Sequence, residues 1–163
     1  MGGDAGPGMV VGGAALARER HPNLRFLLFG DEAKINPLLS RYRALRDVVE
    51  VRHTDDVVKS TDRPSQALRQ GRQSSMRLAI NAVADGEAGG VVSAGNTGAL
   101  MAMSKIALKS MPGIDRPAIC GVLPTLRGES VMLDLGANVD CDQENLVQFA
   151  IMGAAFARTI LGL

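Results

Sequence analysis

Residues 91–100, with the sequence VVSAGNTGAL, join a predicted buried strand to a predicted helix through a short glycine turn. Gly95 and Gly98 leave the backbone open to close approach, while Asn96 and Thr97 can cap the helix or donate hydrogen bonds to a ligand. The first N–H groups of a helix are unpaired and lie at the positive end of its dipole. The turn therefore predicts a site for a phosphate or a developing oxyanion, with an ordinary helix cap as the alternative.

A second polar loop follows a predicted strand in residues 133–142, LDLGANVDCD. Asp134 lies between two leucines in the expected interior of the sheet, where a carboxylate is costly unless it has a partner. We expect Asp134 to orient a catalytic or binding group, with backbone N–H groups as the alternative partners. Asn138 can reach the same cleft as a neutral donor, and Asp142 is predicted to cap the last helix. Cys141 is a poor nucleophile because the two flanking aspartates raise its pKa.

A third candidate is the basic segment 63–76, RPSQALRQGRQSSM. Arg69 and Arg72 are three residues apart, so we expect them to share a helix face and to provide countercharge for a phosphate. A solvated basic face is the alternative interpretation. The hydroxyl groups that could add donors belong to Ser65, Ser74 and Ser75.

Composition excludes several classes of function. The net charge of +1, the single tyrosine and the absence of tryptophan argue against nucleic-acid binding. Two cysteines without CxxC spacing and a start without an apolar signal indicate a reducing cytoplasm. The apolar stretch 146–163 is interrupted by Gln148 and Arg158, so we expect a core helix rather than a membrane span. His21 and His53 are isolated and predict no metal site.

Helical and strand patterns alternate along the chain, which predicts an α/β fold with a largely parallel sheet and a single domain over residues 1–163. We expect helices over 7–20, after Asp31 until a break near Pro37, over 64–84 with a break at Gly71, after the Gly95 turn, and from Asp142 onward. We expect strands over 24–29, 48–52, from Val91, over 119–123 and over 131–135.

The chain resembles the phosphate acyltransferases of bacterial phospholipid synthesis. The matching blocks, in family order, are MGGD at 1–4, RPSQA at 63–67, SSM at 74–76, SAGNTGALM at 93–101, RPA at 116–118, LDLGANVDC at 133–141 and QFAIMG at 148–153. The resemblance implies a three-layer α/β/α sandwich with a largely parallel sheet, related to isocitrate and isopropylmalate dehydrogenases. It also implies that the first strand and the C-terminal half of the family fold are absent from this chain, which we therefore expect to be inactive by itself.

The resemblance implies an enzyme that makes acyl phosphate from an acyl carrier protein thioester and inorganic phosphate, without a nucleotide cofactor or a metal. It further implies a cytoplasmic homodimer that associates peripherally with the membrane and supplies a membrane glycerol-phosphate acyltransferase. Two alternatives stay open: a truncated half that keeps folding or dimerisation surfaces without turnover, and a dehydrogenase-like nucleotide-binding domain. The second lacks a Gly-x-Gly-x-x-Gly turn after a predicted strand.

Inorganic phosphate is already anionic, so this reaction needs positioning and oxyanion stabilisation rather than an activated side-chain nucleophile. We expect Asn96 or Asn138 to stabilise the tetrahedral oxyanion and Asp134 to hold one of these donors in place. The residues expected to bind phosphate or substrate are Gly2, Gly3, Asp4, Ser65, Arg69, Arg72, Ser74, Ser75, Ser93, Gly95, Thr97, Gly98 and Gly136.

Overall fold

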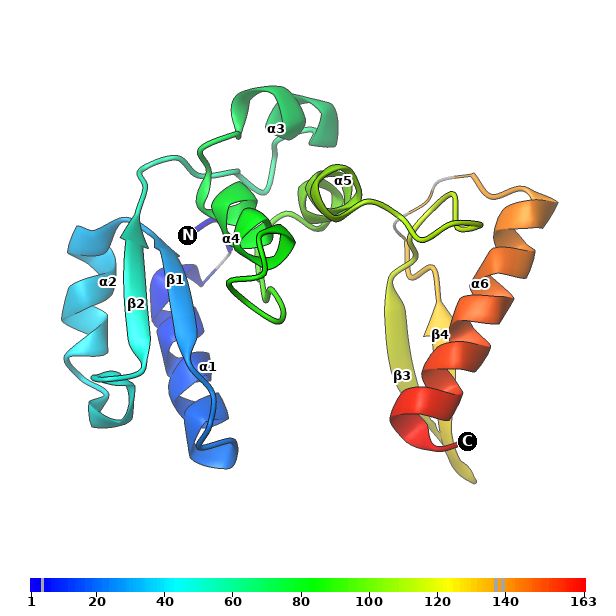
Figure 1. Cartoon of the computed structure of the whole chain (residues 1–163), viewed down its shortest axis with the longest axis horizontal. Coiled ribbons are helices and arrows are strands. Elements are labelled where there is room, and N and C mark those ends of the chain that lie inside the picture. The colour runs from blue at the N-terminus through cyan, green and yellow to red at the C-terminus, as the bar shows by residue number, and fades with distance from the viewer. Residues whose placement is uncertain (4, 137, 139) are drawn as a thin grey trace. The chain divides into compact units, whose positions relative to one another are not determined.

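The computed structural model describes residues 1–3, 5–136, 138 and 140–163. The chain divides into two compact units, Met1–Leu108 and Lys109–Leu163. The first unit contains α1 (Gly6–Arg20), β1 (Phe26–Gly30), α2 (Glu32–Leu39), a 3-10 turn (Arg43–Leu45), β2 (Val49–His53), α3 (Pro64–Gln70), α4 (Ser75–Ala84) and α5 (Thr97–Leu108) (Figure 1). The second contains β3 (Cys120–Thr125), β4 (Gly128–Leu133), α6 (Gln143–Phe156) and a π-helical turn (Ala157–Leu161). The single domain expected over the whole chain stays a prediction.

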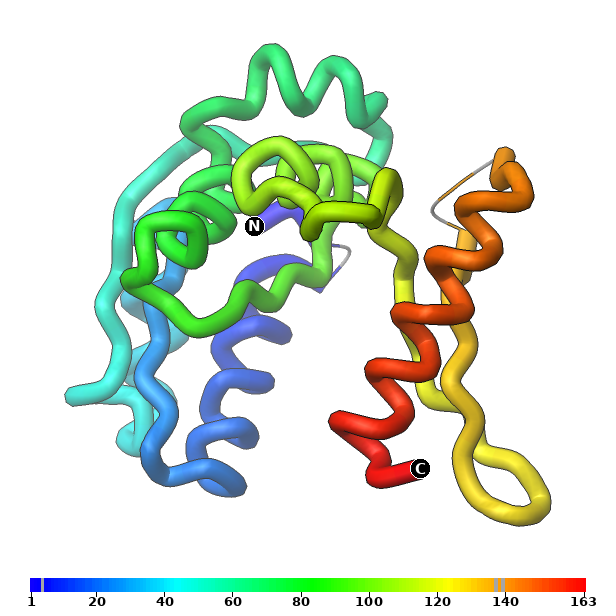
Figure 2. Tube along the Cα trace, turned by 45° about the vertical axis from the view of Figure 1, so that its right-hand side comes forward, coloured from blue at the N-terminus to red at the C-terminus, as the bar shows by residue number. Residues whose placement is uncertain are grey.

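The first unit is built on a parallel strand pair. β1 and β2 run in register from Phe26 opposite Val49 to Gly30 opposite His53. α1 packs along these strands (Figure 2), and its buried Val11 contacts a cluster of apolar side chains from both strands. The helix that Asp31 was expected to cap is α2, and the Asp31 carboxylate accepts from the N–H of Ala33 at 3.0 Å. These local predictions are confirmed, although α2 continues through Pro37 and ends at Leu39.

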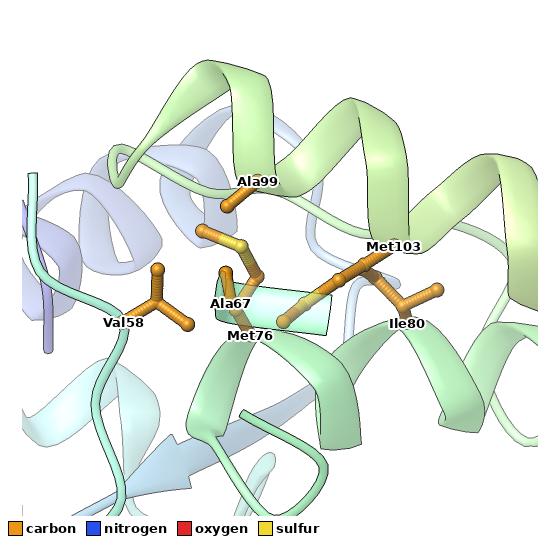
Figure 3. Close-up of a cluster of buried hydrophobic side chains, with 6 residues drawn as sticks. All are labelled: Val58, Ala67, Met76, Ile80, Ala99 and Met103. Atoms are coloured by element: carbon orange, nitrogen blue, oxygen red, sulfur yellow. The ribbon is translucent and has the colours of Figure 1, made fainter. Parts of the chain in front are cut away.

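Helices α3, α4 and α5 enclose a second core in the same unit. Figure 3 shows Ala99 and Met103 of α5 facing Met76 and Ile80 of α4, and both Ile80 and Met103 are almost fully buried. The predicted break at Gly71 is confirmed, because α3 ends there with the Gly71 N–H bonded to the carbonyl of Ala67. This core holds the first turns of α4 and α5 in place.

The strand expected from Val91 is not formed. The segment before α5 has no strand pairing, and Val92 is 98% exposed instead of buried. A strand needs a neighbour to receive its backbone hydrogen bonds, and within the described residues β1 pairs only with β2. The prediction failed because it was made from side-chain type, whereas the outcome depends on a partner strand.

The prediction of a largely parallel sheet is wrong for the second unit, where β3 and β4 are antiparallel. Thr125 pairs with Gly128, so only Leu126 and Arg127 connect the two strands. A connection of that length can join only antiparallel strands, because a parallel pair needs a long crossover. The two units together show an α/β protein with one small parallel and one small antiparallel sheet.

Helix α6 packs on this hairpin and begins as expected at Asp142, which forms a reciprocal capping box with Asn145. Gln148 is buried and exchanges two hydrogen bonds of 2.9 Å with the side chain and the backbone N–H of Asp115. The expected core helix is only partly buried, since Leu146 and Ile151 are about 60% exposed. A two-stranded hairpin covers one side of a helix and leaves the other open.

No helix in the described part of the chain combines the length and the apolar character that crossing a bilayer requires.

Candidate functional site

Three loops of the first unit meet beyond the carboxyl end of β1. Met1 lies against Gly30, the last residue of that strand. A Cβ atom on Gly2 would overlap the carbonyl oxygen of Val58, and one on Gly3 would lie 2.7 Å from the carbonyl oxygen of Ala94. The backbones of the 1–3, 54–62 and 91–96 loops are therefore in direct contact, at the edge of a parallel sheet where ligands commonly bind. Asp4, which was assigned to the same site, lies outside the described residues.

The first turn of α5 presents unpaired donors, as the sequence predicts. Asn96 caps the helix through its side-chain oxygen, which accepts from the N–H of Ala99 at 3.0 Å. The N–H of Gly95 donates to the Ser93 hydroxyl at 3.2 Å. Within the described residues, the N–H groups of Thr97 and Gly98 have no acceptor, and both residues are exposed. These two groups can donate to an anion at the positive end of the helix dipole.

The side-chain amide of Asn96 is already engaged. Its nitrogen donates to the carbonyl oxygens of Lys59, Ser60 and Asp62 at 3.1, 3.2 and 2.8 Å. The amide has two N–H bonds, and these three carbonyls occupy both. Asn96 was expected to donate to an oxyanion. To do so, it would first have to break one of its hydrogen bonds to these carbonyls.

The serines of the basic segment have different surroundings. Ser74 is buried and caps α4, with its hydroxyl donating to the carbonyl of Gly71 at 2.6 Å and accepting from the N–H of Arg77 at 3.3 Å. The hydroxyl hydrogen of Ser74 is therefore used within the fold. Ser75 lines a cavity described below, whereas Ser65 lies exposed in the first turn of α3.

Arg69 and Arg72 do not share a helix face. Arg69 belongs to α3 and donates from Nε to the carbonyl of Ser65 at 3.2 Å, whereas Arg72 lies in the turn after Gly71. The helix ends between them, so their spacing of three residues no longer places them on one side. Both guanidinium groups are exposed, and their role as phosphate countercharge stays a prediction.

A cavity of about 110 Å³ lies beside the three loops. Its walls are Leu27–Phe29 of β1, residues 91–95, residues 1–3 and apolar side chains of α1 and α4. Ser75 and Ser93 contribute the polar side chains, and none of the described residues that line it carries a charged side chain. Such a lining suits an apolar side chain or a further strand rather than a free phosphate.

The second unit brings Asp134 and Asn138 together. One Asp134 oxygen accepts from the backbone N–H of Asn138 at 3.2 Å and from its side-chain nitrogen at 2.9 Å, while the other accepts from the Cys141 thiol at 3.2 Å. The Asn138 nitrogen also donates to the carbonyl of Pro117 at 3.2 Å, so both of its amide hydrogens are used. Gly136 lies in the same exposed turn with a positive φ of 83°.

Asp134 was expected inside a strand over residues 131–135, but it lies directly after the strand. β4 ends at Leu133, and Asp134 adopts a left-handed φ of 60° in a half-buried turn. Its partners are mainly side chains rather than the backbone N–H groups that were the alternative. The expected pairing of Asp134 with a polar donor is therefore what the geometry shows, in a turn that Asp and Asn tolerate better than most residues.

The pKa values of the Asp134 carboxyl and the Cys141 thiol shift in opposite directions. Burial acts to raise the pKa of Asp134, but the hydrogen bonds from Asn138 and Cys141 and the charge of Arg116 outweigh it, so the pKa lies below its usual value. Partial desolvation and then the hydrogen bond to Asp134 raise the pKa of the Cys141 thiol. The predicted direction, a raised pKa of the thiol, is confirmed, but desolvation and Asp134 are its main causes, whereas the flanking Asp142 contributes least.

Two groups were missed by sequence reasoning. Arg116 donates from Nη1 to the carbonyl of Asp140 at 2.9 Å and so braces the polar turn, although only its place in the RPA block marks it in the sequence. His53 is not isolated, because ligand atoms of Asp31, His53 and Asp55 lie within 4.8 Å of one another. Its Nδ1 accepts from the N–H of Glu32 at 3.2 Å, so this ring nitrogen is already engaged within the fold.

Comparison with known proteins identifies the family. A family model described as "Fatty acid synthesis protein" matches residues 1–163. The whole chain is 66% identical to a phosphate acyltransferase of Rhodospirillum centenum and 60% identical to one of Paramagnetospirillum magneticum, covering 46% of each relative. It is 63% identical to the phosphate acyltransferase of Rhodospirillum rubrum, of which it covers 47%. The chain thus spans about half the length of the curated relatives it matches, and it belongs to the fatty acid synthesis protein family.

Proposed function

We propose that this chain forms the phosphate-binding half of a phosphate acyltransferase, which makes acyl phosphate from an acyl carrier protein thioester and inorganic phosphate. The observation that carries the proposal is the pair of N–H groups of the exposed residues Thr97 and Gly98, which have no acceptor among the described residues, in a chain whose relatives are named phosphate acyltransferase. These donors would hold the phosphate without a nucleotide cofactor or a metal.

In this reaction a phosphate oxygen attacks the thioester carbon and forms the new C–O bond. The C–S bond then breaks, and the carrier protein leaves as a thiolate that takes up a proton. The phosphate is already a nucleophile at neutral pH, so the site must hold this anion against the thioester carbonyl and stabilise the oxyanion. The N–H groups of Thr97 and Gly98 and the Thr97 hydroxyl suit the first task. For the second task we keep the predicted oxyanion donor Asn138, whose side chain Asp134 orients within the second unit.

For the complete fold we propose the three-layer α/β/α sandwich related to isocitrate and isopropylmalate dehydrogenases. The apolar cavity supports it, because it separates β1 from the 91–95 segment. A further parallel strand in this cavity would pair with both and would give Val91 and Val92 the neighbour that they lack. A sheet of this kind would place the 1–3, 54–62 and 91–96 loops at one carboxyl edge.

We also propose an acyl carrier protein as donor partner, a cytoplasmic homodimer with peripheral membrane association, and a membrane glycerol-phosphate acyltransferase that consumes the product. The exposed apolar side chains of α6, Leu146 and Ile151 among them, support a further contact with protein. The net charge of +1 gives no support for nucleic acid as a partner.

The decisive experiment joins this chain, in one polypeptide, to the residues that follow the matched region in the Rhodospirillum centenum relative, together with any that precede it. The joined protein is incubated with acyl carrier protein thioester and isotopically labelled phosphate, and the labelled acyl phosphate is separated and measured. We expect labelled acyl phosphate to form, and the thiol of the carrier protein to be released, only when phosphate is present. Release of free thiol without phosphate dependence, while the intact relative forms acyl phosphate, would contradict the proposal. Reduction of a nicotinamide cofactor would instead support the dehydrogenase alternative.

A further inference from the structure

We propose that Asn96 is a positioning residue that ties the Lys59–Asp62 turn to the first turn of α5, and that it does not itself contact the reacting atoms. The inference rests on the proposed function, because it concerns how the phosphate-binding N–H groups of Thr97 and Gly98 are held. It reassigns a side chain that residue type alone suggests as an oxyanion donor.

The hydrogen bonds of Asn96 carry the inference. Its side-chain oxygen accepts from Ala99 in α5, and its nitrogen donates to the carbonyls of Lys59, Ser60 and Asp62, more than thirty residues away in sequence. Every hydrogen of the amide is engaged, and its oxygen already caps the helix. The side chain thus links two loops and has no N–H left for a ligand.

The Lys59–Asp62 turn depends on this link. Inside the turn, the N–H of Lys59 donates to the Asp62 carboxylate at 2.8 Å, and the N–H of Asp62 donates to the Lys59 carbonyl at 3.1 Å. Both bonds are local and leave the turn free to move as a whole. Among the hydrogen bonds of the described residues, those from Asn96 are the ones that fasten the carbonyls of this turn to α5.

The first residue of α3 connects the Lys59–Asp62 turn to the proposed phosphate site. α3 follows the turn directly and begins at Pro64, and a Cβ atom on Gly98 would lie 2.9 Å from the Pro64 ring. Any movement of the turn would therefore shift Pro64 against the residue whose N–H is to bind phosphate. Asn96 would set the accessibility of that donor without contacting the ligand.

The test compares Asn96→Asp with Asp31→Ala. Asn96→Asp keeps a side-chain oxygen to cap α5 but removes both donors, whereas Asp31→Ala removes the cap of α2, which among the described residues shares no hydrogen bond with the partners of Asn96. In the 163-residue chain we expect the N–H groups of Lys59 and Asp62 to exchange with solvent faster in Asn96→Asp, with Ala99 still protected. Asp31→Ala should leave all three unchanged. Unchanged exchange at Lys59 and Asp62 in Asn96→Asp would overturn the inference.

Kinetics of the joined protein then separate the two roles. A positioning residue predicts that Asn96→Asp raises KM for phosphate by about 10- to 100-fold and leaves kcat nearly unchanged. An oxyanion donor predicts a fall in kcat of about 100- to 1000-fold, and that result would overturn the inference. If the wild-type chain shows no phosphate-induced shift of the Thr97 and Gly98 amide resonances, the proposed phosphate site fails, while the exchange result still decides whether Asn96 holds the turn.

Discussion

One carboxylate oxygen of Asp134 accepts both the backbone N–H of Asn138, at 3.2 Å, and its side-chain N–H, at 2.9 Å. These two donors from one residue orient the carboxylate. Its second oxygen accepts a hydrogen bond from the Cys141 thiol. Asp134, Asn138 and Cys141 thus form a hydrogen-bonded cluster, in which the carboxylate accepts from both of the other side chains.

Replacing Asp134 with Asn should lower the pKa of Cys141 toward its ordinary value. The substitution removes the acceptor charge that favours the protonated thiol, and Asn tolerates the left-handed backbone at this position. The pH dependence of the alkylation rate measures the pKa, in a Cys120→Ser background that leaves one reactive thiol. If the pH midpoint of alkylation is the same with Asp134 and with Asn at this position, the carboxylate does not control the pKa of the thiol.

Acid should destabilise the native chain more than its Asp134→Asn variant. The pKa of Asp134 is lowered on folding, so its contribution to stability is complete above the unfolded pKa of about 3.9 and is lost as the pH falls through the folded value. Urea unfolding at pH 7 and at pH 3 measures this loss. Equal losses in the two proteins would mean that other carboxylates account for the acid sensitivity of the second unit.

Gly2→Ala should lower the free energy of unfolding by about 1–3 kcal/mol, because its Cβ would overlap the carbonyl of Val58 and force two backbones apart. Gly13→Ala is the matched control. Gly13 lies within α1 with nothing near its Cβ position, so alanine there should raise the free energy of unfolding by about 0.5–1 kcal/mol. Urea unfolding of both variants decides the matter, and a neutral Gly2→Ala would show that the three loops are loosely packed.

Cys141→Ala should keep most of the acyl-transfer activity of the joined protein. The raised pKa of this thiol disfavours the thiolate that a covalent intermediate would need. Mass spectrometry after incubation with thioester alone, without phosphate, should find no acyl adduct. A stoichiometric adduct on Cys141 would establish a two-step reaction in place of direct attack by phosphate.

Features set by a few neighbouring residues could be predicted from the sequence. The caps at Asp31 and Asp142 and the helix break at Gly71 depend on hydrogen bonds within one turn, and the structure has all three. The pairing of Asp134 with Asn138 is equally local, since the two residues are four apart. Residue type and spacing suffice where the partner lies within reach of the same turn.

Features set by distant neighbours could not be predicted in this way. The segment at Val92 has the residues of a strand but lacks a strand beside it, and Arg69 and Arg72 are separated by the end of α3. The three carbonyl partners of Asn96 lie more than thirty residues away, and no local pattern marks them. Candidate donors can thus be recognised in a sequence, but whether they are free to bind a ligand depends on the tertiary structure.

The reciprocal bonds between Gln148 and Asp115 bear on which mutations the second unit can tolerate. Gln148→Leu would match the apolar residues around it in sequence, yet it would remove both hydrogen bonds that hold the loop before β3 to α6. Gln148→Glu would keep the shape, but it would set two carboxylates against each other at neutral pH. Genetic variation at this buried position should therefore be narrower than at its exposed neighbours Leu146 and Val147, although their side chains are the more hydrophobic.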